Sequence, residues 1–144
     1  MLTIEERFSA ALHKTARAWR QALDRRLKDL GVGQAGWMAI ATIAKSERSP
    51  SQTELAHQLG VEDPTMVSMI DRLVKAGFVL RQPSETDRRV KLVVLTAAGQ
   101  DINAKVKAAA DAFRLELLRD VDAERLRLAT ELLESLLLDT ERAL

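Results

Sequence analysis

Two helix-start signals lie unusually close together between residues 51 and 64 of this chain. Ser51 and Glu54 stand at the ends of a capping box, in which their side chains satisfy free backbone amides of the first helical turn. Gly60 is a typical helix stop. Asp63 is predicted to be the N-cap of the next helix, with Pro64 at its first position. Because the second start follows the stop by only three residues, the two helices are predicted to cross sharply.

A hairpin is predicted immediately after this pair of helices. Residues 78–82 and 90–95 have the composition of β-strands, and the segment between them is too long and polar for a tight turn. It carries Asp87, Arg88 and Arg89. A helix, a tight turn and a second helix form a DNA-reading element, and a hairpin with a basic tip is how a wing is built. Together they predict a winged helix-turn-helix, whereas the two helices alone would also fit a helical hairpin within a core.

Long helices are predicted on both sides of this part, because apolar residues recur there at spacings of three and four. Gly31 and Gly33 are predicted to end the first of them, and Thr96 and Asp122 to cap the last two. The predicted helices are residues 5–30, 34–46, 97–119 and 123–142.

The predicted fold class is therefore mainly α (α+β), a winged helix-turn-helix with N- and C-terminal helices that form a dimerisation domain. One domain is expected over residues 1–144, with the DNA-binding part at 34–96 and the dimerisation helices at 1–30 and 97–144. The terminal helices have more apolar surface than the small winged core can cover, which predicts a homodimer. A monomer whose last two helices pack on each other is the alternative.

The composition predicts a soluble, cytoplasmic protein. Charged residues make up 30% and apolar residues 47% of the chain, and no apolar run approaches the roughly 18 residues of a membrane span. Glu5 and Glu6 stand where a signal peptide would carry basic residues. The chain has no cysteine, so it has no disulfide or thiolate metal site.

The charge is unevenly distributed along a chain whose net charge is only +1. Residues 1–47 carry a net charge of +3, residues 48–96 of +1 and residues 97–144 of −3. A protein with this distribution can present a basic face to phosphate while its far end is acidic.

The predicted DNA contacts lie at the start of the first helix, on the second helix, which begins after Asp63, and at the wing. Small polar and thioether side chains at the start of the second helix can reach base edges in a major groove. An arginine at a wing tip suits the narrow, negative minor groove; a surface ion pair is the alternative role for it. Val67, Ile70, Leu73 and Val74 are predicted to pack in the core. The predicted DNA contacts are Ser51, Gln52, Pro64, Thr65, Met66, Ser68, Met69, Arg72, Asp87, Arg88 and Arg89.

A ligand site is predicted at Arg17, Trp19, Trp37 and Met38, where aromatic rings and an arginine would suit an aromatic carboxylate. The alternative is that these aromatic residues belong to the core. No catalytic motif, metal-binding pattern or cofactor loop is present, and His13 and His57 are expected on the surface. We therefore expect no enzyme activity.

The wing motif, with Leu95, Thr96 and Gly99 after it, resembles the wing-to-helix signature of the MarR family of bacterial transcriptional regulators. Residues 17–20, 24–27 and 60–64, with Gln34 and Trp37, resemble its SlyA-like branch. The resemblance implies an obligate homodimer that binds palindromic promoter sites. There it would repress transcription or counteract silencing, and phenolic or other aromatic compounds often relieve such repression. The absence of cysteine excludes the peroxide-sensing branch.

The same resemblance assigns roles to single residues. Arg89 would enter the minor groove, Asp87 would orient it and Arg88 would contact phosphate. Pro64, Thr65, Ser68 and Met69 would face the major groove. Many relatives carry arginine where this chain has Ser68, which removes one strong contact. A winged-helix module that binds protein, without specific DNA binding, is the alternative function.

Overall fold

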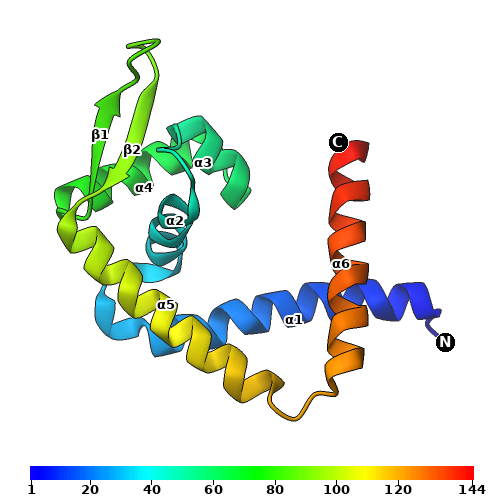
Figure 1. Cartoon of the computed structure of the whole chain (residues 1–144). Helices are drawn as coiled ribbons and strands as arrows, with labels where there is room; N and C mark the ends of the chain where they lie inside the picture. Colours follow the sequence, from blue (N-terminus) through cyan, green and yellow to red (C-terminus); the bar gives the residue numbers. More distant parts are fainter. The chain divides into compact units, whose positions relative to one another are not determined.

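The computed structural model describes all residues 1–144 and divides into two compact units, Met1–Asp111 and Ala112–Leu144. Figure 1 shows the six helices and the single two-stranded sheet. In chain order the elements are α1 (Ile4–Arg26), the 3₁₀ turn η1 (Lys28–Leu30), α2 (Gly33–Lys45), α3 (Gln52–Leu59), α4 (Asp63–Lys75), β1 (Val79–Pro83), β2 (Lys91–Leu95), α5 (Ala97–Leu118) and α6 (Ala123–Ala143). The predicted fold class, mainly α with a small sheet, is confirmed.

Helix α1 ends earlier than the sequence predicted. It begins with a capping box, in which the Thr3 hydroxyl accepts from the Glu6 amide at 3.1 Å and the Glu6 carboxylate accepts from the Thr3 amide at 2.7 Å. The α-helix stops at Arg26, and the chain tightens into η1 before Gly31, whose φ of 71° is left-handed. One helix over residues 5–30 was therefore wrong, because the last turn narrows to 3₁₀ geometry, as is frequent at helix ends.

The two helices of the helix-turn-helix follow each other as predicted, but the second of them, α4, begins one residue earlier than predicted. The capping box of α3 is confirmed: the Ser51 hydroxyl accepts from the Glu54 amide at 3.1 Å. Gly60 adopts a φ of 67° and ends α3. The N-cap of α4 is Glu62, not Asp63, so Pro64 is the second helical residue. Proline is accepted at either position, since neither amide has an intrahelical acceptor.

The wing is an antiparallel hairpin whose register pairs Val79 with Leu95 and Pro83 with Lys91. The second strand also pairs along its other edge with the segment before α3, where the Val93 amide donates to the Pro50 carbonyl at 2.8 Å. This extra pairing fastens the base of the wing to the start of the helix-turn-helix.

A small apolar core holds these elements together. Helices α2, α3 and α4 and both strands contribute to it, and each fully buried aliphatic or thioether side chain contributes about 1.5–3 kcal/mol. The largest fully buried side chains are Ile40, Leu55, Met66, Ile70, Val79 and Val93. This core fixes the faces that α3, α4 and the wing present to solvent.

The junction between the wing and α5 is closed by one threonine. The Thr96 hydroxyl donates to the Gly77 carbonyl at 2.6 Å and accepts from the Gly99 amide at 3.1 Å. The Thr96 amide donates to the carbonyl of Phe78 at 3.0 Å. The predicted cap of α5 is confirmed, and the same residue ties the end of α4 to the start of α5.

Unit Ala112–Leu144 contains the end of α5 and the whole of α6. The Asp122 carboxylate accepts from the Arg125 amide at 3.0 Å, which confirms the predicted N-cap of α6. None of the residues of α6 is buried. None of the helices in the chain combines the length and hydropathy that a bilayer span requires.

Replacing Gly99 by alanine is expected to destabilise the winged core. A Cβ atom at this position would lie 2.1 Å from the Phe78 carbonyl oxygen, so backbone must move, which costs on the order of 1–3 kcal/mol. Thermal unfolding followed by circular dichroism measures the loss. The neighbouring exposed Ala98, replaced by serine, is the control and should change the melting temperature only slightly. Equal melting temperatures for wild type and Gly99→Ala would contradict the close approach.

Candidate nucleic-acid interface

Helix α4 presents one polar face to solvent. Four of its exposed residues, Pro64, Ser68, Asp71 and Lys75, follow one another at spacings of four, three and four, and therefore share this face. Thr65 is also exposed at its start. Prolyl, hydroxyl, carboxylate and ammonium groups thus stand on a helix of 13 residues whose opposite side is held in the core.

The methionines of α4 do not belong to this face. Met66 is fully buried and Met69 nearly so, so the prediction that they contact DNA is wrong. The buried stripe begins one residue earlier than predicted, and Val67, which was assigned to the core, is 40% exposed. Flexible thioether side chains fill irregular gaps between packed elements well, which explains why the core contains methionine at both positions.

The start of α3 also differs from the prediction. Ser51 is buried, and its hydroxyl caps α3, so we correct its role from a DNA contact to a structural one. Gln52 is half-buried, and its side-chain oxygen accepts a hydrogen bond of 2.5 Å from Nε of Arg81. Its amide group is thus engaged within the protein.

Sequence reasoning missed Arg81, which lies on β1 and reaches three segments. Besides Gln52, its guanidinium bonds the Asp71 carboxylate at 2.6 Å and the Val67 carbonyl at 3.2 Å. An arginine at an inward-facing position of a predicted strand is the signal that could have found it, because such a charge requires partners.

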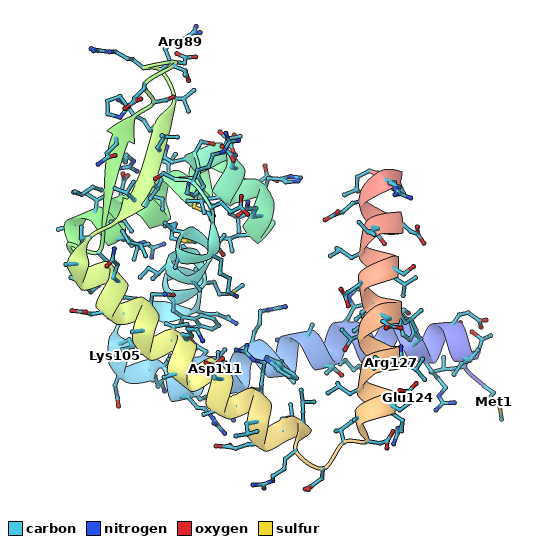
Figure 2. All side chains as sticks on the ribbon, viewed as in Figure 1. Met1, Arg89, Lys105, Asp111, Glu124 and Arg127 are labelled. Atoms are coloured by element: carbon cyan, nitrogen blue, oxygen red, sulfur yellow. The ribbon has the colours of Figure 1, made fainter.

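The wing tip carries an arginine whose side chain is held in one orientation by a neighbouring carboxylate. Nε and Nη2 of Arg89 bond the two oxygens of the Asp87 carboxylate at 3.1 and 3.2 Å, and the Arg89 amide bonds the same carboxylate at 3.1 Å. The Arg89 side chain is nevertheless 91% exposed, and Figure 2 shows it at the far end of the wing. Arg88 is exposed beside it. The carboxylate orients one guanidinium without removing it from solvent.

The same contact sets the acidity of Asp87. The Arg89 guanidinium, and after it the Arg89 backbone amide, hold the pKa of the Asp87 carboxyl below its ordinary value. The carboxylate is therefore ionised throughout the physiological range, so Asp87 carries the charge that pairs with Arg89.

None of the predicted ligand residues lines the cavity between α2 and α4. Trp37 is buried, and its indole N–H donates to the Asp24 carboxylate at 2.9 Å, so it links α2 to α1 and is not available to a ligand. Trp19 and Met38 are half-buried and Arg17 is exposed. The alternative, a core role, is confirmed for Trp37.

That cavity has a volume of about 430 Å³ and lies in the first unit, between the start of α2 and the second half of α4. Its lining is mainly apolar and backbone, with one cationic side chain. The lining residues are Gly31, Val32, Gly33, Gln34, Ala35, Gly36, Met69, Arg72, Leu73, Ala76 and Phe78. No group of three or more His, Asp or Glu side chains is placed to hold a metal ion, and both histidines are exposed.

An exposed helix face beside a protruding basic wing defines the winged helix-turn-helix class. The family model of the MarR family matches residues 34–91. The crystal structure of the transcriptional regulator PA3341 is 38% identical, with a TM-score of 0.88 over 94% of this chain and 98% of that chain. The reduced form of MarR from E. coli is 25% identical, with a TM-score of 0.77 over 95% and 98% of the two chains.

The fold is also shared by CouR from Rhodococcus jostii RHA1, solved bound to p-coumaroyl-CoA. It is 19% identical, with a TM-score of 0.80 over 94% of this chain and 95% of that chain, a likeness that shows the fold alone. The chain belongs to the MarR family of transcriptional regulators. Members of this family are DNA-binding and generally ligand-responsive regulators, not enzymes.

The titration of Asp87 should depend on Arg89 and not on Arg88. In wild-type protein the Asp87 carboxyl is expected to titrate below its ordinary pKa, and Arg89→Gln should raise that pKa because it removes the main hydrogen-bond donor. Carbon-detected NMR of the carboxyl group measures both. The pair stabilises the wing above the unfolded-state pKa of the aspartate, and this contribution is lost as the pH falls through the lowered folded-state value. Arg88→Gln is the control; an equal shift in that variant would contradict the pairing.

Proposed function

We propose that this protein is a sequence-specific regulator of transcription that binds double-stranded DNA as a homodimer at palindromic promoter sites in the cytoplasm. One observation carries the proposal: the exposed face of α4 and the protruding, preoriented arginine of the wing belong to one compact unit. We also assign the chain to the SlyA-like branch, on the residue pattern at 17–20, 24–27 and 60–64.

In this proposal α4 occupies a major groove. Pro64, Thr65 and Ser68 face base edges, and Arg72 contacts the backbone at the flank of the helix. Serine at position 68 offers one hydroxyl where an arginine would make a bidentate contact to guanine, which is worth about 1–3 kcal/mol of discrimination. The preferred site should therefore differ at that base pair from the sites of relatives that carry arginine.

The wing reaches the neighbouring minor groove. An arginine inserted in a narrow minor groove benefits from the strong negative potential there, and Asp87 holds the guanidinium of Arg89 in a bidentate pair before DNA arrives. Arg88, exposed beside it, contacts phosphate. Base reading and electrostatic anchoring thus come from different parts of the same unit.

The apolar surface of α6 supports dimerisation. Five of its leucines are 42–58% exposed in the single chain: Leu128, Leu132, Leu133, Leu137 and Leu138. Removal of such surface from water contributes roughly 25 cal/mol per Å², and a second copy of the chain offers the same surface. A two-fold dimer would place the two α4 helices about 34–36 Å apart, one turn of DNA, and would require a palindromic site.

Selection of bound duplexes from a random DNA pool, at near-physiological salt, tests this function. Wild-type protein should enrich a palindrome with half-sites about one helical turn apart. Arg89→Ala should weaken binding to every duplex and lower the dependence of affinity on salt, because one contact with the negative groove is lost. The fold and the dimer should persist, as judged by circular dichroism and sedimentation.

Three other outcomes of this selection are informative. Binding without an enriched motif would replace specific regulation by an architectural role. No binding at all would favour the protein-interaction module, whose wing should tolerate charge reversal at Arg88 and Arg89. Normal binding of the selected palindrome by Arg89→Ala would overturn the role of the wing.

We further propose that a small aromatic carboxylate occupies the cavity between α2 and α4 and releases the protein from DNA. A volume of about 430 Å³ falls within the usual range for small-molecule sites, roughly 300–1,000 Å³. Arg72 is the only charged side chain in its lining, and it also flanks the exposed face of α4. A carboxylate bound to Arg72 would withdraw that guanidinium from the DNA backbone.

Salicylate and p-coumarate are the probes for this cavity. In calorimetry either acid should bind wild-type protein and bind Arg72→Gln at least about tenfold more weakly, since a charge-assisted pair is lost. Arg48→Gln, which removes an exposed arginine outside the cavity lining, should bind like wild type. Affinity of wild type for DNA should fall when the acid is present. Unchanged binding of the acids to Arg72→Gln would contradict the site.

A further inference from the structure

Arg81 connects the three parts that a winged helix-turn-helix needs to keep in register. Its Nε donates to the Gln52 side-chain oxygen at 2.5 Å, at the first residue of α3. Its Nη2 bonds the Asp71 carboxylate at 2.6 Å and the Val67 carbonyl at 3.2 Å, both on α4. Arg81 itself is in β1, the first strand of the wing. One guanidinium thus joins the wing to both helices.

The position of Asp71 makes this contact relevant to DNA. Asp71 lies on the exposed face of α4, between Ser68 and Lys75 in the row of outward residues. Its side chain is 60% exposed, whereas that of Arg81 is only 26% exposed. The arginine therefore reaches from the protein side and holds a carboxylate that faces outward, in the centre of the surface proposed to read bases.

Stability alone does not explain this arrangement. An ion pair with one partner so exposed contributes little to the free energy of folding, and the winged core already has its apolar residues. A planar guanidinium with several donors in a fixed geometry is, however, well suited to hold groups from different elements at defined distances.

We infer that Arg81 is a positioning residue that locks α3, α4 and the wing into one rigid reading unit, so that the helix and Arg89 meet adjacent grooves at a fixed separation. The inference rests on the proposed DNA-binding function and deepens it. Gln52, predicted from the sequence to contact DNA, acts here as a partner of Arg81. The Arg81 cluster (Gln52, Val67, Asp71 and Arg81) thereby supplies specificity without touching a base.

A specificity ratio separates this role from a direct electrostatic one. The ratio is the dissociation constant for a random duplex divided by that for the palindrome selected by wild-type protein, both at one salt concentration. Arg81→Gln removes a positive charge and Asp71→Asn removes a negative one, so they should shift the affinity for random DNA in opposite directions. Both remove the Arg81–Asp71 ion pair and leave at most a weaker neutral hydrogen bond, so both should lower the specificity ratio, by on the order of tenfold.

The double variant and a charge control complete the test. Arg81→Gln with Asp71→Asn should lower the ratio no further than Arg81→Gln alone, because Arg81→Gln already removes the partner of Asp71. Lys75→Gln removes a charge from the same face of α4, but Lys75 has no bond to the wing; it should weaken both affinities and leave the ratio within about threefold of wild type. Circular dichroism must show all four variants folded.

The outcomes keep the inference and the proposed function apart. If wild-type protein shows no preference for any palindrome, the proposed function fails. The inference fails if wild type prefers the palindrome but the variants change affinity alone. Arg81→Gln would then lower the affinities for both duplexes, Asp71→Asn would raise them, and the specificity ratio would stay the same. Arg81 would in that case be a phosphate contact. If Asp71→Asn alone loses sequence preference, and only at a single base pair, Asp71 contacts a base directly. That result would also overturn the inference.

Discussion

Burial of Met66, Ile70 and Leu73 in the core decides which face of α4 reaches solvent. These side chains share one side of the helix, and the core that receives them is contributed by α2, α3 and both strands. Rotation of α4 would put apolar groups into water and polar groups into the core, and each such exchange is costly. The outward row of polar residues on α4 is thus a consequence of packing on the opposite side.

Apolar packing holds the elements of the core together, and the polar contacts around the core set how these elements and the wing arginine are oriented. Thr96 joins the end of α4 to the start of α5, and Gly99 allows the two backbones to approach so closely that no Cβ fits. The Arg81 cluster joins the wing to both helices, and Asp87 orients Arg89 at the tip. The contacts of Thr96 and Arg81 thus link segments far apart in the sequence, whereas the Asp87–Arg89 pair orients one side chain within the loop of the wing.

In the proposed mechanism, helix α4 serves both DNA binding and release by an effector. The charges on and beside the exposed face of α4 include Asp63, Asp71, Arg72 and Lys75, so the charge of this face is mixed and not strongly basic. In the proposed function, the electrostatic attraction to DNA therefore comes mainly from the wing and from the pairing of two copies. In the proposed mechanism, Arg72 belongs both to the cavity and to the flank of that face, and a carboxylate bound in the cavity would turn its guanidinium away from the DNA backbone. Release by an effector then needs no large movement.

The amino-acid sequence alone determined the order of the elements, because caps, glycine stops and the spacing of apolar residues act within a few residues of one another. The caps at Ser51 and Thr96 and the stop at Gly60 could be predicted for this reason. Whether Met66 or Val67 faces the core, and whether Ser51 and Trp37 are exposed, depends on which distant elements pack against them. The Arg81 cluster joins residues up to 29 positions apart, and only the tertiary structure brings such partners within hydrogen-bonding distance.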